Sequence, residues 1–286
     1  MIRRTAALLA ALMMLVSFAA AEGELRGYSA EEGYVYVTFG QYYQSIDGGI
    51  PDEGTQTWEW HKIAVKEKKA GVTIDPDTLE KDPVLWRVLE ADGERALLMS
   101  EYVLLAGVQH SNLGEFSSFG GDFSRTDLGK RLNGPFLEDT FTAEEQEALL
   151  PYDETTGKVF IPDRATLKNK DYGFTTNKAR KAWATEYAVR CSGAYMYQTK
   201  NGNHSPYWTR TQSSKRTYQA NATKVDGSIG VLSVTGDDVG ARPMILLDLA
   251  RVTVEGGSGT KENPYRLVAG TGTEETAPES EDGTGN

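Results

Sequence analysis

The segment that decides the fold reads VLWRVLEADGERALLMS and covers residues 84–100. Two apolar runs, VLWRVLEA (84–91) and RALLMS (95–100), flank the dipeptide Asp92-Gly93. Both residues of this dipeptide tolerate the backbone angles of a tight turn, so the segment is typical of a β-hairpin. The sequence therefore predicts two neighbouring antiparallel strands over 84–100.

Strand patterns lie at both ends of the chain, and helix patterns lie between them. The turn residues Asp226-Gly227-Ser228 predict a second hairpin in the last third of the chain. Aromatic and β-branched residues predict the other strands over 34–39, 207–211, 218–225, 229–234, 244–249 and 265–268. Strands outside and helices between favour an α+β fold.

The middle of the chain carries the helix signals. Leu128 and Leu132 are spaced i, i+4, and Thr142 with Glu145 fits a capping box ahead of the apolar residues 148–150. Further helices are expected over 165–170, after a cap at Asp163, and over 179–189.

The chain divides into four parts. Residues 1–21 have the basic start, apolar run and Ala19-Ala20-Ala21 cleavage site of a signal peptide, which predicts export and secretion without a membrane anchor. Residues 22–82 contain one strand and then, over 44–82, a long surface excursion with one short strand at 58–65. Residues 83–268 form the main domain. Residues 269–286 form an acidic tail that is expected to be disordered.

Charge and cysteine content exclude several classes of protein. The formal net charge of −11 argues against binding to nucleic acid through bulk electrostatics, because phosphate backbones require clustered Lys and Arg. The single cysteine, Cys191, excludes an intramolecular disulfide. An exported domain of this kind must be held together by its core.

No motif for catalysis, metal or cofactor binding stands out. His61, His110 and His204 lack the i, i+3 or i, i+4 spacing that places two imidazoles around one metal ion. No Gly-x-Ser-x-Gly nucleophile elbow occurs, and Cys191 follows an apolar helix face, as inert core cysteines do. We therefore expect a protein that is not an enzyme and that uses no cofactor or metal.

The candidate binding residues are aromatic and polar. Tyr195, Tyr197, Tyr207 and Tyr218 lie among Gly, Asn, Ser and Lys, a mixture that binding surfaces favour, and Asn221 joins them. The alternative is that these aromatic rings cover small satellite cores.

Two arginines and a tryptophan have the context of the interior. Arg210 and Arg242 lie in strand-like apolar runs, where an unpaired charge is costly. We expect both to pair with acidic side chains or backbone carbonyls, and we expect Trp208 to belong to the core.

Several stretches in one order resemble an uncharacterised family of bacterial extracellular domains, and the resemblance runs from about residue 82 to residue 249. The stretches are VLWRVL (84–89), LLMSEYVL (97–104), SRTDLGKRLNGPFL (124–137), FTAEEQEAL (141–149), KVFIPD (158–163), ATEYA (184–188), YWTRT (207–211) and GARPMILLDL (240–249). The last two also resemble the closing half of the C-type-lectin-like fold in relatives of the formylglycine-generating enzyme.

This resemblance implies a compact α+β domain whose first and last strands pair and whose looped region between Tyr207 and Arg242 presents a surface. It implies no reaction, because the enzyme relatives use a pair of cysteines and only Cys191 is present. The Glu-Pro-Asn and Trp-Asn-Asp runs of calcium-binding lectins are absent as well.

Three functions remain open from the sequence. The first is a secreted recognition module that binds an extracellular glycan or protein through loops at 195–205 and 211–240. The second is an extracellular hydrolase that uses a carboxylate pair including Asp237 or Asp238. The third is a structural component of a surface assembly with the acidic tail as spacer.

Overall fold

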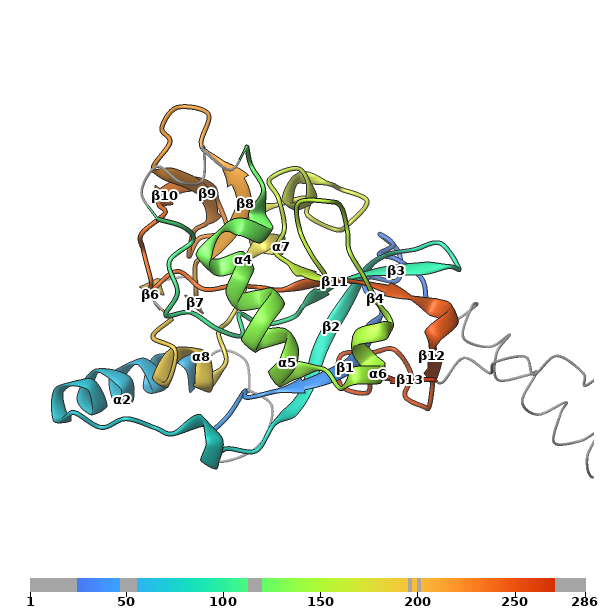
Figure 1. Cartoon of the computed structure of the whole chain (residues 1–286), viewed down its shortest axis with the longest axis horizontal. Helices are drawn as coiled ribbons and strands as arrows, with labels where there is room; N and C mark the ends of the chain where they lie inside the picture. Colours follow the sequence, from blue (N-terminus) through green and yellow to red (C-terminus); the bar gives the residue numbers. More distant parts are fainter. Residues whose placement is uncertain (1–24, 47–55, 113–119, 195–196, 200–201, 271–286) are drawn as a thin grey trace, which may run out of the picture.

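The computed structural model of the chain describes residues 25–46, 56–112, 120–194, 197–199 and 202–270. The predicted signal peptide, Tyr195 and nearly all of the predicted acidic tail lie outside these residues. Strands and short helices are mixed along the described chain, so the fold is α+β (Figure 1). Among the described residues, no helix has both the length and the apolar character needed to span a membrane.

An eight-stranded sheet forms the centre of the molecule, with strand order β12-β13-β1-β2-β3-β11-β4 and with β5 also paired to β11. Its strands are β1 (Tyr36–Tyr42), β2 (Asp82–Ala91), β3 (Arg95–Ser100), β4 (Leu149–Leu150), β5 (Val159–Phe160), β11 (Met244–Asp248), β12 (Val252–Val254) and β13 (Tyr265–Ala269).

The predicted central hairpin is confirmed. Strands β2 and β3 pair antiparallel, and Gly93 takes a φ of +89° in the turn between them. The Asp92 carboxylate accepts hydrogen bonds from the backbone nitrogens of Glu94 and Arg95 at 3.1 and 2.7 Å, which closes the turn. Residues 84–89 of β2 are all buried, so both faces of this strand are covered. The hairpin therefore lies at the heart of the core.

The first and last strands of the described chain lie side by side. β1 pairs in parallel with β13, with Val37 opposite Tyr265, and in antiparallel with β2 on its other edge. The backbone nitrogen of Tyr36 also donates to the carbonyl of Gly259 at 2.8 Å. The C-terminal segment is thus built into the same sheet as the N-terminal one.

The helices are short apart from one. They are α2 (Gln56–Ala70), α4 (Asp127–Arg131), α5 (Leu137–Thr140), α6 (Ala143–Glu147), α7 (Asn177–Arg180) and α8 (Glu186–Arg190). The predicted capping box is confirmed, because Thr142 accepts from the Glu145 nitrogen and Glu145 accepts from the Thr142 nitrogen. The helix expected over 165–170 is only the 3₁₀ turn Thr166–Lys168, whose N-cap is Ala165 and not Asp163, although the Asp163 carboxylate accepts a hydrogen bond from the Thr166 nitrogen at 2.6 Å.

The predicted strand at 58–65 is wrong, because this segment lies inside helix α2. Trp60 is buried, and Ala64, one helical turn later, packs against the same core. Glu67 continues this face and pairs with Arg190 of α8 at 2.5 Å, and the two helices lie side by side (Figure 1). The buried face thus follows the helical period, which the surrounding Gly, Pro and Lys residues obscure.

The predicted helix over 179–189 is also wrong in its middle. The structure has α7 and α8 with an extended stretch between them. Ala184 in that stretch forms a parallel bridge with Val103, whose backbone nitrogen donates to the Trp183 carbonyl at 2.9 Å. Thr185 then caps α8 by accepting from the Ala188 nitrogen. Backbone pairing with a distant segment therefore replaces the local helical hydrogen bonds.

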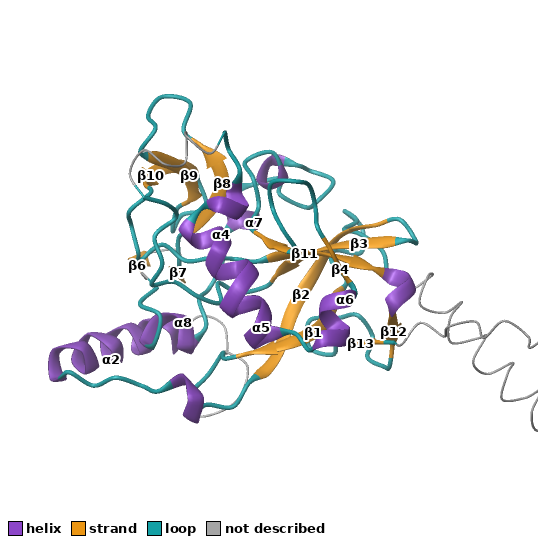
Figure 2. Cartoon of the chain, viewed as in Figure 1, coloured by secondary structure: helices purple, strands orange, loops and turns teal. Residues whose placement is uncertain are grey.

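A separate three-stranded sheet lies at the opposite end of the molecule from β12 and β13 (Figure 2). Its strands are β8 (Tyr207–Gln212), β9 (Gln219–Thr223) and β10 (Ile229–Ser233), in the order β10-β9-β8. The predicted hairpin at Asp226-Gly227-Ser228 joins β9 to β10, and Gly227 has a φ of +80°. Beside it, β6 (Tyr197–Thr199) and β7 (Gly202–His204) form a two-stranded ribbon.

Arg242 lies inside the molecule, where its guanidinium carbon is 5.7 Å from the ring centre of Tyr207 in the small sheet. Its side chain is fully buried, its Nε donates to the carbonyl of Ser100 at 2.7 Å, and its guanidinium lies 3.6 Å from the Glu101 carboxylate. The Glu101 carboxylate also accepts a hydrogen bond from the Nε of Arg87 at 2.7 Å and another from the Nζ of Lys261 at 3.0 Å. The expectation that Arg242 is structural is confirmed, and Glu101 is the carboxylate shared by three cations.

Candidate functional site

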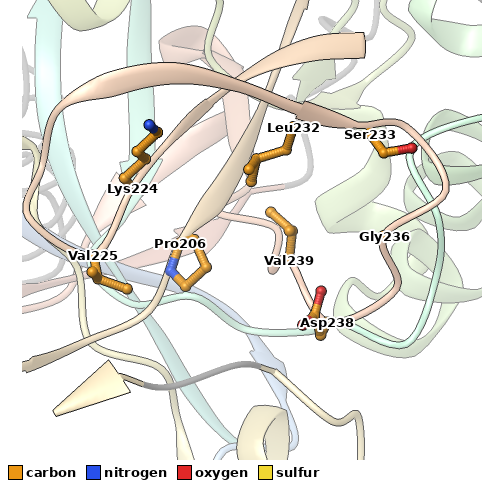
Figure 3. A pocket seen from close by; sticks show the side chains of 8 residues that line it. All are labelled: Pro206, Lys224, Val225, Leu232, Ser233, Gly236, Asp238 and Val239. Carbon is orange, nitrogen blue, oxygen red and sulfur yellow. The ribbon is translucent and has the colours of Figure 1, made fainter. Parts of the chain in front are cut away.

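A pocket of about 490 Å³ lies on one face of the three-stranded sheet. Its described lining is mainly aliphatic, and Figure 3 shows Leu232 and Val239 close together in the middle of the view with Pro206 and Val225 to one side. This volume lies inside the range of roughly 300–1,000 Å³ that is usual for small-ligand sites. The pocket is therefore large enough for an apolar group of a ligand.

Strand alternation places Leu232 and Val231 on opposite faces of β10, and Ser233 at the end of the strand also lines the pocket. Successive side chains of a strand point to opposite faces, so Leu232 faces the pocket while its neighbour Val231 faces away and is 41% exposed. Pro206 and Val239, on the other side of the pocket, are held in place by backbone hydrogen bonds. The Gly240 nitrogen donates to the Pro206 carbonyl at 3.0 Å, and the Trp208 nitrogen donates to the Gly240 carbonyl at 2.9 Å. These bonds tie the segment before Arg242 to the start of strand β8.

Two charged side chains frame the apolar lining. Lys224 and Asp238 lie on opposite sides of the group of lining residues in Figure 3. Neither side chain forms an ion pair with another residue in the described part of the chain. A ligand with an apolar centre and a charge at either end fits this arrangement.

A second pocket, of about 570 Å³, uses the other face of the same sheet. Val231, Asn221 and Gln219 contribute from the sheet, and the loop between β8 and β9 contributes Lys215 and Arg216. Both pockets are lined mostly by residues of the 211–240 region that the sequence indicated. Whether this region binds a ligand stays a prediction.

Tyr207 and Asn221, two of the predicted binding residues, are buried. Tyr207 has no exposed surface, and its hydroxyl donates to the Arg180 carbonyl at 2.6 Å. Asn221 is 7% exposed, and its Nδ2 donates to the carbonyls of Thr211 and Gln212 at 3.1 Å each. The Tyr207 hydroxyl thus ties the small sheet to helix α7. Asn221 stabilises the β8 bulge and also lines the second pocket.

Among the predicted binding residues whose side chains the structure describes, Asn221 lines the second pocket, whereas Tyr207 and Tyr218 line neither of these two pockets. Tyr218 is 41% exposed and accepts a hydrogen bond from Arg216 at 2.9 Å, so its ring is available at the surface beside the second pocket. Tyr197 belongs to β6, and Tyr195 lies outside the described residues.

Arg210 and Trp208 behave as expected from the sequence. Arg210 pairs with Asp163 at 3.0 Å and with Asp153 at 3.6 Å. Trp208 is fully buried, with its ring centre 5.3 Å from that of His110. Both are structural elements of the small sheet.

A third pocket, of about 420 Å³, places Asp237 and Asp238 opposite helices α2 and α8. Glu67 also lines it, with its carboxylate held by Arg190. Cys191 is the other reactive group of this pocket, and burial raises the pKa of its thiol to about 11. The thiol is therefore protonated near neutral pH, which does not suit a nucleophile.

The histidines are separate and two of them are buried. Burial lowers the pKa of His110 and of His204 to about 4, and the charge of Lys181 contributes at His204. Within the described residues, no three His, Cys, Asp or Glu side chains come close enough to hold a metal ion.

The pocket residues Leu232, Val239 and Arg164 were not singled out from the sequence. Aliphatic residues such as Leu232 carry no sequence signal that separates a pocket wall from a core. A signal does exist for the second pocket, because Lys215 and Arg216 are adjacent cations within the uncharged and basic run TRTQSSKRTYQ (209–219) of an otherwise acidic chain. Comparisons with models of known families, with curated proteins and with solved structures found no match to this chain.

Proposed function

We propose that the protein is a secreted, non-catalytic recognition module that binds a peptide segment of an extracellular protein. The observation that carries the proposal is the aliphatic pocket between Lys224 and Asp238 on the three-stranded sheet. An apolar side chain of the peptide enters the pocket, and flanking charges of the peptide meet Lys224 and Asp238.

The lining favours a peptide over a neutral sugar in this pocket. Sugar rings are commonly bound by stacking on aromatic side chains, and the described lining holds only aliphatic and small residues besides its two charges. Burial of an aliphatic side chain yields about 1.5–3 kcal/mol, which is enough for one anchor of a peptide. The charged pair then sets the orientation of the peptide.

The C-type-lectin-like architecture remains part of this proposal. The small sheet over 207–233 supports it, because the resemblance implies a looped region between Tyr207 and Arg242 that presents a surface. The Cys191 thiol is half-buried, and its raised pKa supports the non-catalytic assignment.

A displayed random-peptide library, selected on the full chain, tests the proposal. Selected peptides should carry an aliphatic residue, and Leu232→Ala should weaken their binding roughly tenfold or more because the variant removes a wall of the pocket. Val231→Ala is the matched control, since it removes an aliphatic side chain from the other face of the same strand.

Equal binding of the selected peptides by wild type, the Leu232 variant and the Val231 variant would refute the pocket as their site. Failure of any peptide to be enriched would refute the peptide as the ligand. Circular dichroism of each variant checks that the fold is retained.

The hydrolase is the second candidate, and one observation favours it. Asp237 and Asp238 line the same pocket as Glu67, so three carboxylates from two segments border one cavity. A panel of chromogenic glycosides and peptides separates the two functions. Turnover that disappears in Asp237→Asn or Asp238→Asn would establish a hydrolase and would sink the non-catalytic assignment.

A further inference from the structure

Three cations border the second pocket of the small sheet without carboxylate partners. Arg164, Lys215 and Arg216 line it, and none of them forms an ion pair with any residue that the structure describes. Elsewhere, exposed cations such as Arg26, Arg95 and Arg266 do pair with acids. The described lining contains no acidic residue, in a chain with a formal net charge of −11. The pocket is therefore a local concentration of positive charge.

The fold holds Arg164 at this place through its backbone. The Arg210 nitrogen donates to the Pro162 carbonyl at 3.0 Å, and the Arg210 guanidinium pairs with Asp163 at 3.0 Å. The Arg164 nitrogen then donates to the hydroxyl of Thr211 at 2.8 Å. These bonds tie the segment after β5 to strand β8, so Arg164 lies beside the loop that carries Lys215 and Arg216.

The loop that carries the other two cations is also fixed. The Ser213 nitrogen donates to the Gln219 carbonyl at 2.9 Å, and the Lys215 nitrogen donates to the Ser213 hydroxyl at 3.3 Å. Arg216 donates to the Tyr218 hydroxyl, and its guanidinium carbon lies 5.8 Å from the centre of the Tyr218 ring. A neutral hydroxyl and a ring orient this cation but leave its charge uncompensated.

The pocket also presents groups that suit hydroxyls. The Nδ2 of Asn221 donates to two backbone carbonyls, which fixes the orientation of the amide and leaves its Oδ1 as an acceptor. The side chains of Gln212 and Gln219 line the pocket and make no hydrogen bond to another described residue. Hydroxyl donors beside an anionic group match this set of partners.

From these observations we infer that the second pocket binds an anionic saccharide. Arg164, Lys215 and Arg216 contact the carboxylate, sulfate or phosphate group of the sugar, and Asn221, Gln212 and Gln219 contact its hydroxyls. The pocket volume of about 570 Å³ is sufficient for such a unit. The site is distinct from the aliphatic pocket on the opposite face of the sheet, and this inference does not depend on the peptide proposed there.

Binding of the full chain to charged polysaccharides and their neutral counterparts tests the inference. The pairs are polygalacturonate with its methyl ester, dextran sulfate with dextran, and phosphomannan with mannan. At least one anionic member should bind more than tenfold more tightly than its neutral counterpart, and the pair that responds identifies the anionic group. The affinity should fall as the salt concentration rises.

Variants locate the site. Arg164→Gln, Lys215→Gln and Arg216→Gln should each weaken binding roughly tenfold, which corresponds to about 1.4 kcal/mol, because each removes a charge-assisted hydrogen bond to the anionic group. Arg266→Gln is the matched control, because it removes one exposed cation from strand β13 and should leave the affinity unchanged. Leu232→Ala should also leave it unchanged.

Three results would overturn the inference: equal binding of charged and neutral members in every pair, no binding by any anionic member, or the same loss in Arg266→Gln as in Arg216→Gln. A single-stranded oligonucleotide serves as a polyanion of another class. Binding of this probe as tightly as of the best polysaccharide would show that the pocket recognises charge without recognising a saccharide.

Discussion

Strands β2 and β10 both contain aliphatic residues, yet the two strands have opposite surroundings. In β2, residues 84–89 are buried without interruption, because β1 and β3 pair with its two edges and packed side chains cover its faces. In β10, no residue is fully buried, and the strand lies at the edge of the three-stranded sheet. The same type of residue therefore stabilises the fold in β2 and lines pockets in β10.

The charged residues of the two regions show the same contrast. Arg87 and Arg242 are buried beside Glu101 in the large sheet. Lys215 and Arg216 are exposed at the small sheet and have no described acidic partner. A buried cation without compensation is costly, whereas an exposed one remains available to a ligand. The large sheet therefore compensates its charges inside the core, whereas the small sheet leaves two cations at the surface.

The largest expected effect comes from removing the shared carboxylate. Glu101→Gln leaves Arg87 and Arg242 buried without a negative charge and should lower the free energy of unfolding by about 3–5 kcal/mol. Glu255→Gln, at the exposed pair with Arg266, should cost at most about 1 kcal/mol. Urea unfolding at neutral pH measures both. Similar losses in the two variants would remove the contrast between buried and exposed pairs.

A smaller effect is expected from acid at His110, which packs against Trp208 beneath the small sheet. Burial lowers the pKa of His110 to about 4, whereas the unfolded chain protonates this residue near pH 6.5. Acid therefore favours the unfolded state. The contribution of His110 is complete above pH 6.5 and is lost as the pH falls to about 4, for a total of about 3 kcal/mol.

The variant His110→Gln should flatten the fall of unfolding free energy between pH 6.5 and pH 4. Wild type is the reference, and the difference between the two slopes is the contribution of His110. Denaturant titrations at four pH values across this interval provide the slopes. A slope that is identical in His110→Gln and wild type would exclude His110 as a source of the acid sensitivity.

The smallest expected effect on stability comes from the same substitution, Val to Thr, made once in each of the two sheets. Val88→Thr places a hydroxyl at a fully buried position of β2 and should cost about 1–3 kcal/mol. Val231→Thr places the same hydroxyl at a position that is 41% exposed and should change stability by less than about 0.5 kcal/mol. Thermal unfolding of both variants is the measurement. Equal shifts in melting temperature would mean that β10 is covered in solution.

Local signals in the sequence predicted the hairpins and the caps. Asp92-Gly93 and Asp226-Gly227-Ser228 predicted both hairpins, because tight turns depend on residues that tolerate positive φ. The pair Thr142 and Glu145 predicted the start of α6, because their side chains accept hydrogen bonds from each other's backbone nitrogens. The helix over 56–70 was missed, because its buried face consists of few residues and is interrupted by lysines.

The sequence predicted both a region and five binding residues for the candidate site, and of these five only Asn221 is in the described lining of the two pockets of the small sheet. The 211–240 segment lines both pockets of the small sheet, but Tyr207 lies inside and Leu232 faces a pocket. A tyrosine among polar residues looks the same in sequence whether its ring faces solvent or another strand. Only the pairing of β8 with β9 and the bridge from Tyr207 to Gly240 decide its direction.

The sequence by itself determined the α+β class, the two hairpins, the structural roles of Arg210 and Arg242, and the core position of Trp208. These depend on turn chemistry, apolar periodicity and the cost of unpaired charge, all of which are properties of short segments. The tertiary structure alone decided the break between α7 and α8, the pairing of β1 with β13, and the meeting of Arg164 with Lys215 and Arg216. Each of these depends on backbone bonds between residues far apart in the chain, and no local pattern encodes such distances.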